Sequence, residues 1–226
     1  MSRHNDLGLY TAELLKKQFP LRKKDLGADA HLSGRGMTFD TEAYDVGGMG
    51  HFCVMRMRAF LGLMKMETVI IAPREVDAPL FNADWIRAFG RETQLVEIYD
   101  TQLQAWTQAP QEALRRLRDR DADLEEYTSE GHWYDSILYD CSYHKKGKKA
   151  ERMNLTAQAY IDTFVSHLAE APGCDPAQQA EKGAKVDAFA EKLLAGGGPA
   201  VSMFTKLFGP ETAKRIVCGH MYGAKA

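Results

Sequence analysis

The sequence lacks the residue patterns that identify several common classes of protein. Its few cysteines are far apart and none forms a C-x-x-C pair, so neither a zinc knuckle nor a thioredoxin-like dithiol is indicated. The four, expected to be reduced packing residues, are Cys53, Cys141, Cys174 and Cys218. No two histidines have the H-x-x-x-H spacing of helical metal ligands, and no serine lies in a G-x-S-x-G motif. Neither a metal site nor a hydrolase nucleophile is therefore predicted.

Strong net charge and long apolar runs are also missing. The formal net charge of −2 argues against a dedicated nucleic-acid-binding protein. No stretch of about 18 apolar residues is present to span a bilayer, and the N-terminus has no apolar core of signal-peptide length. We therefore expect a cytoplasmic protein without a nucleic-acid or membrane partner. The 226 residues suffice for one domain covering 1–226, and we expect a monomer.

The hydrophobic period of the sequence changes near residue 100. Between residues 36 and 100, short segments rich in β-branched and aromatic residues are separated by turn sequences such as GGMG and GRET, which predicts an antiparallel meander. Later segments have apolar residues at i, i+3 and i+4, as in amphipathic helices. Helices are predicted at 8–18, 151–171, 175–195 and 210–222. This order predicts an α+β fold in which helices cover an antiparallel sheet.

Two arginines in the predicted strand at 51–61 form a first candidate binding site. Alternation along a strand puts Arg56 and Arg58 on the same face, among apolar neighbours. Guanidinium groups form bidentate hydrogen bonds with carboxylates, so the pair suits a ligand that carries acidic groups. A solvated sheet face with intramolecular ion pairs is the alternative interpretation.

A basic segment at 144–152, with the sequence HKKGKKAER, is a candidate surface for a macromolecular partner. With the basic residues of 16–24 it would form a positive patch despite the negative net charge, whereas a solvated loop is the alternative interpretation. The lysines assigned to partner binding are Lys145, Lys146, Lys148 and Lys149.

Three segments resemble, in the same order, the motifs of one enzyme family. Residues 72–84, APREVDAPLFNAD, are similar without a gap to a motif of the form FPxPxYxxPLFGxD. Residues 131–143, GHWYDSILYDCSY, resemble a central segment that contains tryptophan, and residues 197–223 resemble a C-terminal segment that contains FG. The family is the ferredoxin-dependent bilin reductases, which includes phycocyanobilin:ferredoxin oxidoreductase. The resemblance covers about residues 36–223.

This resemblance implies a three-layer α/β/α sandwich that holds a linear tetrapyrrole between a central antiparallel sheet and the C-terminal helices. It implies no bound metal or flavin; electrons arrive singly from a [2Fe-2S] ferredoxin, and protons come from the protein and its waters. Asp84 falls on the aspartate thought to protonate the bilin. A carboxyl group among apolar residues keeps its proton near neutral pH, because desolvation disfavours the charged form. The alternative is that Asp84 only caps a turn.

The sequence departs from the family at other positions that contact the substrate. Thr68 stands where the phycocyanobilin-forming branch has its catalytic histidine, and Gly198 stands where other branches have an aspartate. A pocket glutamate of the family falls near Arg58. Thr68 and Gly198 are therefore assigned to substrate binding only, and Asp84 is the one recognisable proton donor. The double bond that is reduced, and hence the product, is left open.

The leading hypothesis is ferredoxin-dependent reduction of a linear tetrapyrrole, biliverdin IXα, by sequential electron and proton transfers. Reduction of an open-chain chlorophyll catabolite on a related scaffold is a second hypothesis. A tetrapyrrole-binding protein without catalytic activity is a third, which the residues at Thr68 and Gly198 favour.

Overall fold

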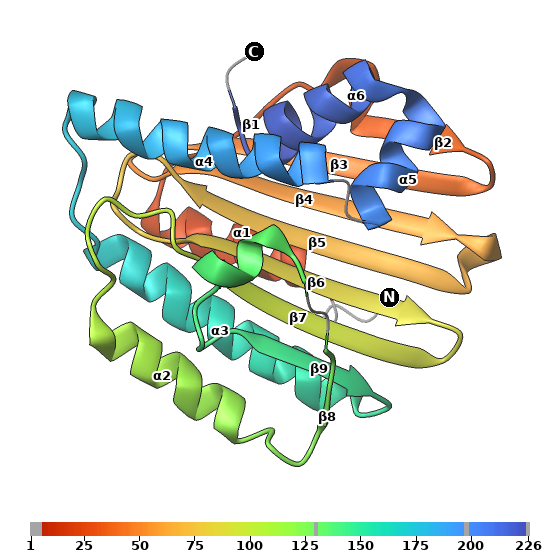
Figure 1. Cartoon of the computed structure of the whole chain (residues 1–226), viewed down its shortest axis with the longest axis horizontal. Coiled ribbons are helices and arrows are strands. Elements are labelled where there is room, and N and C mark those ends of the chain that lie inside the picture. Colours follow the sequence, from red (N-terminus) through yellow and green to blue (C-terminus); the bar gives the residue numbers. More distant parts are fainter. Residues whose placement is uncertain (1–5, 129–130, 197–198, 225–226) are drawn as a thin grey trace.

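The computed structural model describes residues 6–128, 131–196 and 199–224, and a large antiparallel sheet runs through its middle (Figure 1). The strands of the described residues pair in the order β1-β3-β4-β5-β6-β7-β9-β8, and β2 also pairs with β3. Their bounds are β1 Leu21–Lys23, β2 His31–Gly34, β3 Met37–Val46, β4 Gly50–Ala59, β5 Met64–Pro73, β6 Leu80–Ala88, β7 Arg91–Tyr99, β8 Glu125–Glu126 and β9 Tyr143–Gly147.

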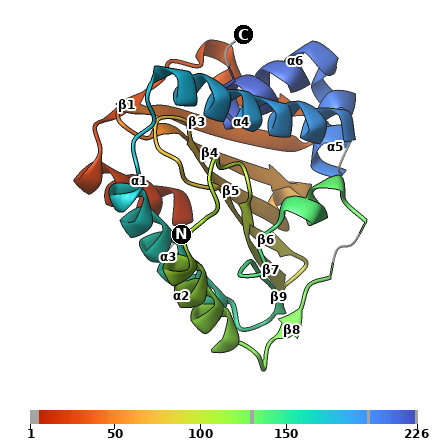
Figure 2. The same ribbon diagram turned by 60° about the vertical axis from the view of Figure 1, so that its left-hand side comes forward.

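Helices cover both faces of this sheet, as Figure 2 shows most clearly. One face carries α1 (Leu7–Gln18), α2 (Gln108–Asp119) and α3 (Ala150–Glu170). The other carries α4 (Pro176–Gly196), α5 (Pro199–Phe208), α6 (Pro210–Lys214) and a π-helical turn at Arg215–Met221. Short 3-10 helices lie at Gly27–Ala30, Phe60–Gly62 and Trp133–Ile137. The prediction of a three-layer α+β sandwich is confirmed.

Residue alternation along the strands divides the core between the two faces. In β4, Phe52 and Val54 belong to the cluster packed against α1 and α3, whereas Cys53 and Met55 face α4, α5 and the π-helical turn. Because side chains on one strand alternate between faces, β4 contributes to the core on both faces of the sheet. The sheet is thus buried on both sides.

The predicted elements agree with the structure over the meander and three of the four predicted helices. The short strands β1, β2, β8 and β9 were not predicted. The strands predicted between 36 and 100 correspond to β3 to β7, and the helices at 8–18, 151–171 and 175–195 correspond to α1, α3 and α4. The helix predicted at 210–222 is only α6 continued by the π-helical turn, while α2 and α5 were not predicted. Gly209 separates α5 from α6 with a φ of 84°, a conformation that glycine adopts without a steric penalty.

No helix among the described residues has both the length and the apolar character needed to cross a bilayer.

Candidate active site

A cavity of about 340 Å³ lies between the sheet and the C-terminal helices. Strands β3 to β7 and β9 form its floor, and α4, α5 and the π-helical turn form its roof. Tyr127 and side chains of the segment 132–138 close one side. Its volume lies within the range of sites for small organic ligands. The apolar side chains of the roof are Phe189, Leu193, Val201, Met203, Phe204, Val217 and Met221.

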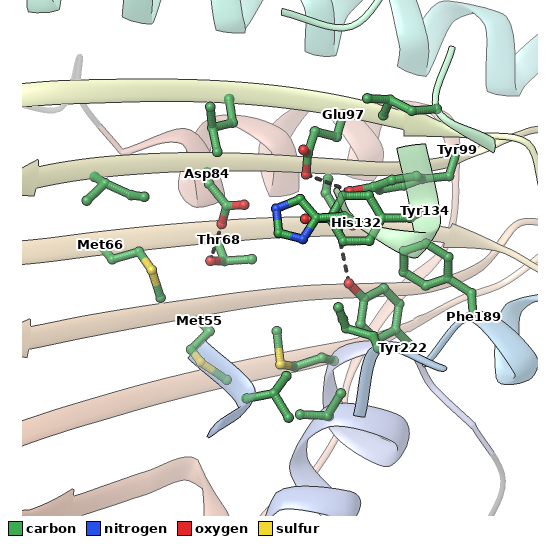
Figure 3. A pocket seen from close by; sticks show the side chains of 18 of the residues that line it. Met55, Met66, Thr68, Asp84, Glu97, Tyr99, His132, Tyr134, Phe189 and Tyr222 are labelled. Atoms are coloured by element: carbon green, nitrogen blue, oxygen red, sulfur yellow. Dashed lines mark hydrogen bonds between the residues drawn. The ribbon is translucent and has the colours of Figure 1, made fainter. Parts of the chain in front are cut away.

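Asp84 lies in the floor of this cavity, beside Thr68 (Figure 3). The two residues are direct cross-strand partners in β5 and β6, and the Thr68 hydroxyl donates a hydrogen bond to the Asp84 carboxylate. Burial raises the pKa of Asp84 to about 7; the Thr68 hydrogen bond opposes this shift, and the negative charge of Glu97 adds to it. Asp84 can therefore hold a proton near neutral pH, at a position from which it could donate the proton to a ligand in the cavity.

A second polar group in the floor is centred on Glu97. Its Oε2 accepts a hydrogen bond of 2.6 Å from the Tyr99 hydroxyl (Figure 3). Its Oε1 lies 3.3 Å from Nε2 of His144. Close by, Asn82 Nδ2 donates to the Tyr222 hydroxyl at 3.0 Å, whereas Asn82 Oδ1 is buried without a hydrogen-bond partner among the described residues. The cavity floor therefore combines a carboxylate, an imidazole and an amide with Asp84.

The side of the cavity is formed by a short aromatic segment. The His132 ring stacks on the Tyr134 ring, with centroids 4.8 Å apart and planes inclined by 14°. The backbone is held here by the Asp135 carboxylate, which accepts hydrogen bonds from the N–H groups of Gly131 at 3.0 Å and His132 at 2.9 Å. This capping arrangement begins the 3-10 helix at Trp133–Ile137 and directs His132 and Tyr134 into the cavity (Figure 3).

Arg56 and Arg58 do share one face of β4, but it is the face opposite the cavity. Arg56 is paired in register with Glu67, whereas Met55 is paired with Thr68, so the alternation that directs Thr68 into the cavity directs Arg56 away from it. Arg56 forms ion pairs with Asp6 at 2.9 Å, Glu42 at 2.9 Å and Glu67 at 3.2 Å. This corrects the sequence-based placement of both arginines on the ligand-binding face.

The lysine segment is also only partly available at the surface. Lys145 is 1% exposed, and its ammonium group pairs with Glu126, so it cannot contact a docking protein. Lys146 pairs with Glu125 at 3.4 Å, and Lys149 pairs with Asp123 at 3.3 Å. Lys148 and Lys149 are exposed. The assignment of Lys145 to partner binding is therefore wrong, because acidic residues of 123–126 cover this strand.

The structure thus brings Thr68 together with Asp84 and places Arg56 and Arg58 away from the cavity. Gly198 lies outside the described residues. Sequence reasoning missed Asn82, Glu97 and His144. Asn82 and Glu97 were detectable in principle: Asn82 is two residues from Asp84 in β6, Glu97 is the cross-strand partner of Asn82 in β7, and all three side chains are on the same face of the sheet. His144 was not, because no local pattern predicts the pairing of β9 with β7.

Within the described residues, no group of three or more His, Cys, Asp or Glu side chains is arranged to hold a metal ion.

Comparison with known proteins gives a structural match without a sequence match. No protein-family model and no curated protein sequence matches the chain. The fold is similar to that of phytochromobilin synthase from tomato, solved in complex with biliverdin, with a TM-score of 0.75 and 11% sequence identity. The alignment covers 98% of this chain and 83% of that chain. At this identity the match shows that the two chains share a common fold.

Proposed function

We propose that this protein reduces a linear tetrapyrrole, with biliverdin IXα as the substrate, reduced ferredoxin as the electron source and Asp84 as a proton donor. The observation that carries the proposal is a carboxyl group with a pKa raised to about 7 in the floor of a largely apolar cavity. The cavity lies between the sheet and the C-terminal helices, where the resemblance places the bilin. The similar fold of a protein crystallised with biliverdin supports the choice of ligand class.

The residues of the cavity suit this chemistry. The apolar roof excludes water from a conjugated ligand. Asn82 Oδ1, which has no partner in the described part of the chain, is a hydrogen-bond acceptor for a pyrrole N–H group. Each two-electron reduction of the bilin consumes two electrons from two reduced ferredoxins and two protons. Asp84 donates one proton to the ligand as it gains electron density, and the His144–Glu97 pair is our candidate source of the second.

Ferredoxin docking is proposed to involve the exposed Lys148 and Lys149. Plant-type ferredoxins are acidic, so this contact should be electrostatic and transient, and activity should fall as salt shortens the Debye length to about 8 Å. Salt-independent turnover that also tolerates charge reversal at both lysines would place the docking site elsewhere.

A tetrapyrrole-binding protein without activity is the second candidate. Thr68, rather than a histidine, is the cross-strand partner of Asp84, which leaves one proton donor fewer than in the phycocyanobilin-forming branch.

A single titration separates the two. Biliverdin is added to the purified protein, the visible spectrum is recorded, and reduced ferredoxin is then supplied without oxygen. Reduction predicts a shifted spectrum that changes again with each electron equivalent and ends in an extractable product. A spectrum that shifts on binding but stays constant through many electron equivalents would support the binding protein without activity. An unshifted spectrum would exclude biliverdin both as substrate and as bound ligand, and the open-chain chlorophyll catabolite would be tested next.

A further inference from the structure

Two neighbouring turns expose bulky apolar side chains at one end of the sheet. They connect β4 to β5 and β6 to β7, at the right-hand end of Figure 1. Phe60, Leu61, Leu63 and Phe89 are 58%, 106%, 61% and 72% exposed. The rings of Phe60 and Phe89 have centroids 6.2 Å apart, and the Phe89 N–H donates to the Leu63 carbonyl at 3.3 Å. We call these four residues the apolar tip.

The backbone of the apolar tip does not suit its residues. Phe60, Leu61 and Phe89 have φ values of 51°, 55° and 50°, in the left-handed region. This region is unfavourable for large L-residues, and glycine, asparagine and aspartate are preferred at such turn positions. Any of these would be less strained and more soluble here, so folding alone does not account for exposed phenylalanine and leucine.

A row of three cations lies behind the apolar tip. Arg58 of β4 is directly opposite Lys65 of β5, which is directly opposite Arg87 of β6. Like charges in this arrangement destabilise a sheet. Arg87 has Glu92 at 3.9 Å, whereas the described residues include no acidic partner for Arg58 or Lys65. The row, which we call the cation row, is therefore complementary to an anionic surface.

We propose that the apolar tip and the cation row together dock on a bilayer that contains anionic phospholipid. Each cation is two residues from a residue of the apolar tip along its strand, and thus about 6–7 Å behind it. An apolar side chain at a membrane interface is buried about 5–10 Å into the boundary between headgroups and acyl chains, which would bring the cation row level with the lipid phosphates. Peripheral contact of this kind needs no spanning helix, although it departs from the sequence-based expectation of no membrane partner.

An acidic protein would also neutralise the cation row. It would not, however, require phenylalanine and leucine to project from the turns beyond the cations, and such a projection is what insertion into a bilayer uses. We therefore assign the surface to lipid and treat protein docking as an outcome of the test.

The test is co-sedimentation of the full chain with two kinds of vesicle, one of equal parts phosphatidylcholine and phosphatidylserine and one of phosphatidylcholine alone. We expect binding to the anionic vesicles and little to the neutral ones. Leu61→Asn with Phe89→Asn should weaken binding by about tenfold or more, because two apolar side chains are lost from the interface. The thermal stability of this variant should be unchanged or higher, because asparagine tolerates positive φ.

Charge variants and matched controls complete the experiment. Arg58→Glu with Lys65→Glu should weaken binding by at least about 25-fold, since each cation near an anionic surface contributes about fivefold. Leu9→Gln and Lys17→Glu change an exposed leucine and an exposed lysine of α1 and should leave binding unchanged. Absence of binding to the anionic vesicles, equal binding to both vesicles, or unchanged binding in the tip and charge variants would each overturn the proposal. Capture of an acidic protein through these residues, with vesicles ignored, would overturn it in favour of protein docking.

Discussion

Glu67 and Asp84 are buried carboxylic acids on neighbouring strands of one sheet, and they face opposite sides of it. Glu67 is paired in register with Trp85, one residue away from the Thr68–Asp84 pair. Burial is the main cause of a raised pKa in both cases, and the value for each is about 7. By pKa alone the two would be equal candidates for a catalytic acid.

Their surroundings separate them. Glu67 accepts hydrogen bonds from the backbone N–H groups of Leu7 at 3.2 Å and Gly8 at 3.0 Å, and it pairs with Arg56 at 3.2 Å. A Cβ atom on Gly8 would lie 2.7 Å from Glu67 Oε1, so α1 approaches too closely to leave room for a ligand. Asp84 has the Thr68 hydroxyl and the open cavity beside it. Access to a cavity, rather than the pKa, therefore distinguishes the candidate catalytic acid from the structural one.

Asp84→Asn should give the largest effect on activity. Asparagine keeps the size and most of the hydrogen bonding but has no proton to donate, so product formation should fall by about two to four orders of magnitude. Biliverdin should still bind with a similar spectrum, and after one electron a bilin radical should accumulate, which electron paramagnetic resonance would detect. Thr68→Val removes the hydrogen bond but leaves the carboxyl group in place, so it should lose far less turnover than Asp84→Asn. Wild-type rates in Asp84→Asn would remove Asp84 from the mechanism, and His132 would be tested next.

Glu67→Ala should affect stability instead of chemistry. It leaves two backbone N–H groups of α1 without their acceptor and removes one carboxylate from Arg56, so the free energy of unfolding should fall by about 1–3 kcal/mol. Denaturant titration measures the loss, and turnover per folded molecule should be unchanged. A large loss of turnover in fully folded Glu67→Ala would contradict the assignment of separate roles to the two faces.

Glu67→Gln tests the pKa itself. The folded pKa of Glu67, about 7, lies above its ordinary value of 4.5, so between these pH values the unfolded chain releases a proton that the folded chain retains. The wild type therefore loses stability from this group as pH rises from about 4.5 to 7, and the glutamine variant does not. The stability of Glu67→Gln relative to wild type should rise with pH across that window; a constant difference would show that Glu67 is not shifted.

Apart from any effect on the second protonation, Glu97→Gln should change the pH dependence of the step in which Asp84 is the proposed proton donor. As the proposed proton donor, Asp84 is active only in its protonated form, so the rate of ligand protonation should fall as pH rises through about 7. Removal of the Glu97 charge lowers the pKa of Asp84, which should move this fall to lower pH by up to about one unit. Single-turnover rates across pH measure the shift. Tyr99→Phe retains the Glu97 carboxylate and is the control; if both variants shift the profile equally, the charge of Glu97 is not the cause.

The sequence predicted the layers of this fold better than the contents of its cavity. Strand alternation and helical periodicity depend on neighbours in the chain, so β3 to β7 and the long helices α3 and α4 were predictable. Asp84 was found through its motif. The pairing of Glu97 with His144 depends on β9 adding to β7 after the 43 intervening residues 100–142, which no local pattern specifies.

Alternation also showed that Arg56 and Arg58 share a face, but it did not show which one. Within a single strand the two faces are equivalent until the packing helices are known, and here both faces of the sheet are buried. The acidic residues that pair with Arg56, at positions 6, 42 and 67, come from three separate segments of the chain. The sequence near Arg56 therefore did not indicate that intramolecular ion pairs, rather than a ligand, neutralise its charge.

Arg58→Gln should therefore have the smallest effect on the proposed bilin site. Arg58 lies on the α1 side of the sheet and does not line the cavity, so biliverdin affinity measured by spectral titration should stay within about twofold of wild type. A substitution that removed a charge-assisted bond to a ligand carboxylate would instead weaken binding by about tenfold or more. The same variant should bind anionic vesicles more weakly, because it shortens the cation row, so one protein sample reports on both faces. Weaker biliverdin binding with unchanged vesicle binding would mean that the ligand's acidic groups extend around the end of β4 to Arg58. That result would contradict the assignment of Arg58 to a face without contact to the ligand.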